Sequence, residues 1–94
     1  MNEQEFKHRI KHLALRVIEL ADELPRRRTV DVLDRQLVRS GTSVGANYRS
    51  TCGKSAAGVL AELAIVEEEA EATNCWLELL VEAKIVAETR VTRL

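Results

Sequence analysis

The sequence has few of the residues that interrupt helices or favour strands. Its 94 residues include one proline, four glycines and three aromatic side chains, namely Phe6, Tyr48 and Trp76. Strands are normally rich in aromatic and β-branched residues, so this composition favours helices. Because the chain is shorter than a typical domain, we expect a single domain over residues 1–94.

The features of exported and membrane-spanning chains are also missing. The first residues, MNEQE, contain no basic segment followed by an apolar one, and no stretch approaches the roughly 20 apolar residues of a membrane span. Cys52 and Cys75 are isolated within helical patterns, which favours reduced core side chains over a disulfide. We therefore expect a cytoplasmic protein with no membrane partner.

What the sequence does contain is apolar residues in steps of three and four. In the first helical stretch they are Phe6, Ile10, Leu13, Val17, Leu20 and Leu24. In the last stretch they are Val59, Leu63, Val66, Ala70, Thr73, Leu77 and Leu80. Such steps return to one face of a helix, and that face must be covered. The pattern predicts an all-α fold of long helices packed lengthwise, in a bundle or an oligomer of bundles.

We expect three helices, over about residues 3–24, 30–52 and 56 to at least 86. The tail from Glu88 either continues the third helix or begins a fourth that is too short to complete a bundle. Typical start and stop residues mark these ends. They are Asn2 with Glu5 as a capping box, Pro25 as a stop, Thr29 or Asp31 as a cap, Gly53 as a stop and Ser55 as a cap.

The second helix is rich in small residues at its centre, where the sequence reads SGTSVGA from residue 40. This segment is a weak helix former, since each glycine costs about 1 kcal/mol relative to alanine. Small side chains let another helix come close, so we expect the tightest packing here, with a loop at Gly41–Gly45 as the alternative. The residues assigned to packing or oligomer contacts are Ser40, Gly41, Val44, Gly45, Asn47, Leu77 and Leu80.

Charge is unevenly distributed, although the formal net charge is only −1. The first 54 residues carry a net charge of +4 and the remaining 40 a net charge of −5. The candidate nucleic-acid-binding residues are Arg26, Arg27, Arg28, Arg35, Arg39 and Arg49. The alternative is that they pair with the acidic run Glu67, Glu68, Glu69 and Glu71. Since no aromatic residues alternate with the arginines, any binding should be directed to the phosphate backbone.

No combination of residues indicates catalysis. His8 and His12 lie one helical turn apart, but they stand among basic residues without a third ligand, which favours a solvated helix face. Asn47 is expected to form a hydrogen bond that fixes helix register, with a ligand role as the alternative. Trp76 is expected to fill a gap between helices. We therefore expect no enzyme activity, no metal and no cofactor.

Two stretches resemble the sequence of a known family. Residues 36–49, QLVRSGTSVGANYR, resemble the helix-two signature of the four helix bundle proteins, also called the 23S rRNA intervening-sequence protein family. Residues 64–73, AIVEEEAEAT, and the following WLELL are similar to its third helix. The resemblance covers about residues 6–87. It implies an antiparallel up-and-down four-helix bundle that assembles into homopentamers and has no enzymatic activity.

The chain departs from the family pattern in two places. Ser50 stands where an acidic residue often follows the Tyr-Arg pair, and the fourth helix is short or missing. The resemblance implies a self-associating interaction or scaffold protein, with RNA, DNA or a protein as candidate partner. The alternative within the same resemblance is an accessory factor that binds a reverse transcriptase and nucleic acid in a diversity-generating retroelement.

Overall fold

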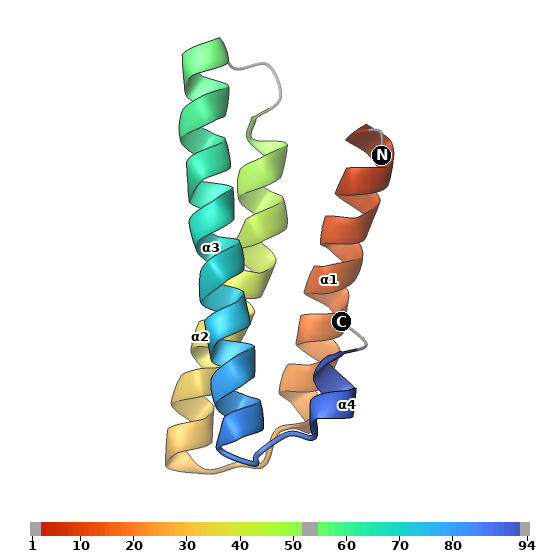
Figure 1. Ribbon diagram of the computed structural model, residues 1–94, viewed down its shortest axis with the longest axis vertical. Coiled ribbons are helices and arrows are strands. Elements are labelled where there is room, and N and C mark those ends of the chain that lie inside the picture. Colours follow the sequence, from red (N-terminus) through yellow and green to blue (C-terminus); the bar gives the residue numbers. More distant parts are fainter. Residues whose placement is uncertain (1–2, 52–54, 93–94) are drawn as a thin grey trace.

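The chain folds into antiparallel helices, as a computed structural model that describes residues 3–51 and 55–92 shows (Figure 1). The helices are α1 (Glu3–Glu23), α2 (Arg28–Arg49), α3 (Ala56–Glu82) and α4 (Glu88–Val91). Within the described ranges there is no strand, and the molecule measures 44 × 23 × 18 Å. The prediction of an all-α bundle of long helices is confirmed.

Helix α2 is the central element. It packs against α1 on one side and α3 on the other, whereas the described backbones of α1 and α3 lie further apart. The short α4 lies beside the lower end of α1 in Figure 1. Side chains of α1, α2 and α3 nevertheless share the core clusters, and α4 stands at the end of the bundle where α1 ends (Figure 1).

The core consists of two clusters along this three-helix arrangement. The larger cluster contains Val17, Leu20, Leu24, Val30, Leu37, Leu77 and Leu80. The smaller contains Ile10, Val44 and Val66, with Tyr48 packed against it. Toward the upper end the apolar seam is incompletely covered, since Phe6 and Leu63 remain 38% and 39% exposed. The Phe6 ring meets the Tyr48 ring edge-on, with centroids 4.8 Å apart.

Helix α2 begins earlier than expected. Arg27 has the extended backbone of an N-cap and makes no side-chain capping bond, so the predicted caps Thr29 and Asp31 are wrong. Both lie in the first turn, and Val30 between them is buried. The carboxylate of Asp31 still favours this end, because it faces the positive pole of the helix dipole.

Helix α2 runs without a break through its glycines, so the alternative of a loop at Gly41–Gly45 is wrong. Close packing against α1 compensates for the weak propensity. A Cβ atom at Gly41 would lie 2.9 Å from Val17 Cγ1, and one at Gly45 would lie 2.9 Å from Ile10 Cγ2. Real Cβ atoms essentially never come that close, so the backbone of α2 approaches α1 only because these positions lack a side chain.

Helix α3 starts as predicted, with Ser55 Oγ accepting a hydrogen bond from the Gly58 amide at 3.2 Å. It ends at Glu82, so the prediction of a helix to at least residue 86 is wrong. Lys84 has a positive φ of 61°, and the Ile85 amide donates to the Leu80 carbonyl at 2.9 Å. This is a Schellman ending, which is usually formed by glycine. It turns Ile85 onto the core, and the tail then begins the short α4.

The structure tests the expectation for one cysteine, Cys75, and for membrane-spanning helices. Cys75 is exposed on α3, so the prediction of a core side chain there is wrong. It lies two residues from both Thr73 and Leu77, which occupy the buried face, and a two-residue step points away from that face. Asn2, Cys52 and Gly53 lie outside the described residues. No helix in the described ranges combines the length and apolarity that crossing a membrane requires.

Candidate polar seam and basic cleft

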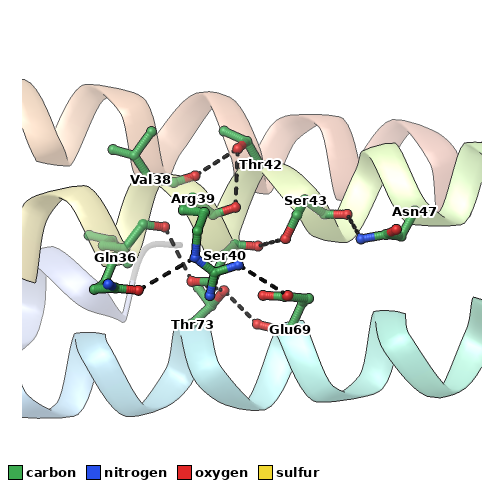
Figure 2. Close-up of polar contacts among 10 residues, drawn as sticks. Gln36, Val38, Arg39, Ser40, Thr42, Ser43, Asn47, Glu69 and Thr73 are labelled. Atoms are coloured by element: carbon green, nitrogen blue, oxygen red, sulfur yellow. Dashed lines mark hydrogen bonds and ion pairs between the residues drawn. The ribbon is translucent and has the colours of Figure 1, made fainter.

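A buried hydroxyl pair joins α2 to α3 (Figure 2). Thr73 Oγ1 lies 2.9 Å from Ser40 Oγ and 2.8 Å from the Glu69 carbonyl oxygen, and its single proton serves one of them at a time. Ser40 Oγ donates to the Leu37 carbonyl at 3.3 Å. Both side chains are at most 3% exposed. A contact between hydroxyls at this depth favours the observed register of α2 along α3, because another register would leave both groups buried without each other.

The other small polar side chains of α2 bond within their own helix. Thr42 Oγ1 donates to the Val38 carbonyl at 2.7 Å, and Ser43 Oγ donates to the Ser40 carbonyl at 3.0 Å. Asn47 Nδ2 donates to the Ser43 carbonyl at 2.9 Å, also within α2. This bond of Asn47 does not link two helices, whereas the Ser40–Thr73 pair joins α2 to α3 in the buried part of the seam (Figure 2).

One arginine of the predicted basic set pairs with the acidic run. Arg39 Nη1 lies 3.2 Å from Glu69 Oε1, and its Nε donates to Gln36 Oε1 at 3.4 Å (Figure 2). The Arg39 side chain is 56% exposed, so solvent screens this ion pair.

Among the described residues, Glu69 Oε2 and the Trp76 indole nitrogen, both on α3, are buried without a hydrogen-bond partner. Trp76 itself packs against the main core cluster.

The remaining arginines of the set do not form one patch. Arg26 and Arg27 lie in the connection before α2, Arg28 opens the helix and Arg49 closes it. At 1.5 Å per residue, the two ends of α2 are about 32 Å apart. The lower end also carries acids. Burial raises the pKa of Asp34, and the charge of Asp31 raises it further, while Arg26 and Arg35 oppose these effects.

A cleft between α1 and the upper half of α2 was not anticipated from the sequence. It encloses about 500 Å³. Its lining residues are Lys7, Ile10, Lys11, Ala14, Thr42, Gly45, Ala46, Tyr48 and Arg49. In the sequence, the features that form the cleft are two cations one turn apart, Lys7 and Lys11, and the small residues Gly45 and Ala46 of another helix. They identify a cleft only once the two helices are known to be neighbours.

A second hollow, of about 510 Å³, lies between α3 and α4 and includes Glu78, Glu82 and Glu88 in its wall.

An ion pair between Arg90 and Glu23 holds α4 in place beside α1. Arg90 Nη2 lies 2.6 Å from Glu23 Oε2, and Arg90 Nε donates to Glu23 Oε1 at 3.2 Å. The hydrogen bond from Arg90 lowers the pKa of Glu23, and the bond to Glu23 raises the pKa of Arg90.

Most of the residues assigned to packing or oligomer contacts are buried within the chain. Gly41 and Val44 on α2 and Leu77 and Leu80 on α3 are buried, as is Ser40. Gly45 and Asn47 are half-buried. His8 and His12 are exposed, and Arg16 Nε donates to His12 Nε2 at 3.1 Å. The described residues contain no group of three or more side chains that could hold a metal ion.

Comparison with known proteins gives one informative likeness. No protein-family model and no curated protein matches the chain. The fold is similar to a crystal structure, at 1.70 Å resolution, of a protein of unknown function from the S23 ribosomal protein family of Bacteroides thetaiotaomicron. The TM-score is 0.82 and the sequence identity 33%, over 89% of this chain and 79% of that one.

Proposed function

The chain belongs to the S23 ribosomal protein family, and from this premise we propose that it is a non-enzymatic, self-associating scaffold protein of the 23S rRNA intervening-sequence type. In this proposal the chain is cytoplasmic, binds no cofactor and assembles as a homopentamer. A basic surface of the assembly contacts the backbone of RNA or DNA. The two parts, assembly and nucleic-acid contact, are supported by different observations and need separate experiments.

The proposed assembly is supported by the large apolar side chains that remain exposed on the folded chain. The exposed large hydrophobic residues are Phe6, Leu15, Ile18, Val32, Leu60, Leu63, Ile65 and Leu79. Leu60 is 70% exposed, and Leu63, one turn further along α3, is 39% exposed. Contiguous apolar surface on a small protein is normally covered by a partner, and copies of the same chain are the commonest one.

The molar mass in solution tests the assembly. We expect the wild-type protein to have about five times the chain mass in sedimentation experiments, and the Leu60→Lys/Leu63→Lys variant to have a lower mass with unchanged helix content. Cys75→Lys, on the same helix at another exposed position, serves as the matched control for an added charge. A wild-type protein that sediments as a monomer at all accessible concentrations would exclude self-association.

The nucleic-acid contact is supported by the exposed arginines. Arg26, Arg27, Arg28, Arg35, Arg39 and Arg49 all present exposed side chains. Fivefold repetition around a ring would place several copies of each arginine on one surface and concentrate its positive potential. Phosphate contacts of this kind give affinity without reading the base sequence.

Fluorescence anisotropy with short RNA and DNA across a salt series tests this contact. We expect affinity to fall steeply as salt rises, and the Arg27→Ala/Arg28→Ala/Arg35→Ala variant to bind weakly with a shallower salt dependence, because each lost phosphate contact removes about 0.7–0.9 from the slope. Arg9→Gln, at an exposed position in the first half of α1, is the control for the loss of a cation. Absence of binding at low salt would contradict the nucleic-acid role and leave a protein partner as the alternative.

A further inference from the structure

The cleft between α1 and α2 has two unlike parts. Ile10 and Ala14 of α1 and Ala46 of α2 give it an apolar wall, whereas Lys11 and Arg49 belong to opposite sides of its rim. A volume of about 500 Å³ is within the range of pockets that hold small molecules. The cleft is thus both apolar and positively charged, which is the combination that an amphipathic anion requires.

Helix geometry places these residues together. On α1, Lys7, Lys11 and Ala14 follow in steps of four and three, so they share one face. The close approach of Gly45 to Ile10 sets the level of α2 against α1, which brings the last turn of α2, with Arg49, alongside this face. The arrangement depends on the same glycine contact that holds the two helices together.

The charge balance of the rim indicates the charge of its ligand. Lys7 already has a partner, since its Nζ lies 3.2 Å from Glu3 Oε1. Lys11 and Arg49 are both exposed and form no ion pair with a carboxylate of the described residues. Two formal positive charges therefore remain, and a phosphate monoester, with a charge of about −1.5 to −2 at neutral pH, would balance them.

We propose that the α1–α2 cleft is a binding site for a phosphate monoester, with its phosphate at Lys11 and Arg49 and its organic group against Ile10, Ala14 and Ala46. The site is separate from the arginines of the connection and of the lower part of α2. The phosphate monoester is either a free small molecule or the terminal phosphate of a nucleic-acid strand, since both offer the same chemistry.

Titration of the isotope-labelled full chain, followed by amide chemical shifts, tests this site. The probes are phenyl phosphate, inorganic phosphate and phenol. We expect phenyl phosphate to bind at least about tenfold more tightly than either part alone, because it uses both the charged rim and the apolar wall. The shifted amides should be those of α1 and α2 around the cleft. Equal affinity for inorganic phosphate, or shifts elsewhere, would overturn the proposal.

Two variants and one control assign the contacts. Lys11→Gln/Arg49→Gln should lower the affinity for phenyl phosphate at least about tenfold. Ala46→Leu should lower it by filling the apolar part without touching the rim. Arg28→Gln, at the other end of the same helix, should leave it within about twofold. Unchanged affinity in both cleft variants would overturn the site.

A further pair of probes separates the two sources of the phosphate. A short single strand with a 5′-phosphate should outcompete the same strand with a 5′-hydroxyl if the natural ligand is a strand end. Equal competition by the two strands, together with tight binding of phenyl phosphate, assigns the site to a free ester. Phenyl phosphate binding should persist in Arg27→Ala/Arg28→Ala/Arg35→Ala, so failure of the nucleic-acid proposal and failure of this one give different results.

Discussion

At the scale of single residues, the two glycines of α2 make contacts of different stiffness. A Cβ at Gly41 would meet three atoms of Val17, at 2.9, 3.1 and 3.3 Å, whereas a Cβ at Gly45 would meet one methyl group of Ile10. Val17 is fully buried and β-branched, so its side chain has little freedom to move. Ile10 Cγ2 is also carried by a branched β carbon, but it is the single close atom at Gly45 among the described residues, so a smaller shift relieves the contact.

Gly41→Ala is therefore expected to destabilise the protein, and Gly45→Ala is not. Overpacking against Val17 should cost about 1–3 kcal/mol, which exceeds the roughly 1 kcal/mol gained in helix propensity. At Gly45 the two effects should nearly cancel. Urea unfolding of both variants measures the difference. If Gly41→Ala is the more stable of the two, α1 and α2 are not as close as the structure places them.

Lys84 is a second residue with a local cost, because it adopts a left-handed backbone with a φ of 61°. A non-glycine residue in this conformation destabilises the folded state by about 1–2 kcal/mol. A glycine would avoid this strain, but its greater freedom in the unfolded chain offsets part of the gain. Lys84→Gly should thus stabilise the protein by about 0.5–1 kcal/mol in a denaturant titration. Ala83→Gly, at a φ of −80°, is the matched control and should not stabilise it.

At the scale of helices, the hydroxyl pair between Ser40 and Thr73 sets how α2 and α3 align. Thr73→Val keeps the shape of the side chain and removes the hydroxyl, so we expect a loss of about 1 kcal/mol in the free energy of unfolding. Adding Ser40→Ala should cost less than Ser40→Ala does alone, because the partner has already gone. A double-mutant cycle measures this coupling. Thr42→Val, whose hydroxyl bonds within α2, should cost less than Thr73→Val.

The attachment of α4 should depend on pH. The pKa of Glu23 is lowered by its bond to Arg90, so the stabilisation from this pair is present above the unfolded pKa, about 4.3. It is lost as the pH falls through the lowered pKa of the folded state. Amide chemical shifts of α4 should therefore change as the pH falls below the usual range of a glutamate carboxyl. Glu23→Gln should abolish that change, and an identical titration in this variant would contradict the assignment.

The existence of the helices could be predicted from the sequence, whereas some of their ends could not. The apolar spacing and Ser55 identified α3, but its end is decided by Ile85 and Val86, which pack on the core and outweigh the unfavourable backbone of Lys84. The end of α3 thus depends on tertiary contacts, and the position with positive φ is a lysine, so no glycine in the sequence indicates where the helix stops. Similarly, burial of Val30 moved the start of α2 ahead of the residues that usually cap helices.

At the scale of the whole molecule, Leu77 distinguishes the interior from the surface that copies of the chain are proposed to cover. It is 7% exposed and belongs to the main core cluster, together with residues of α1 and α2. Leu77→Asp should unfold the chain or lower its melting temperature strongly, by burying an unpaired charge. Cys75→Asp, two residues away and exposed, should change it little. Near-wild-type melting of Leu77→Asp would show that this seam is not buried.

The site could be predicted only in part, for a reason that also belongs to the whole molecule. The arginines were visible as a group in the sequence, but α2 separates them along its length and Arg39 turns to Glu69 on α3. The α1–α2 cleft combines residues that are far apart in the chain, such as Lys11 and Arg49. The position of the cleft depends on how closely α1 and α2 approach at Gly41 and Gly45. The spacing of side chains in the sequence does not predict that distance.

The order of contacts along the chain has a consequence for how the molecule folds. Each long helix packs against its neighbour in the sequence, so the α1–α2 and α2–α3 hairpins require only short loops to close. Proteins dominated by such local contacts fold quickly. The Glu23–Arg90 pair is different, because it joins residues 67 positions apart. We therefore expect that either hairpin can form first and that the tail docks once α1 and α3 have both packed on α2.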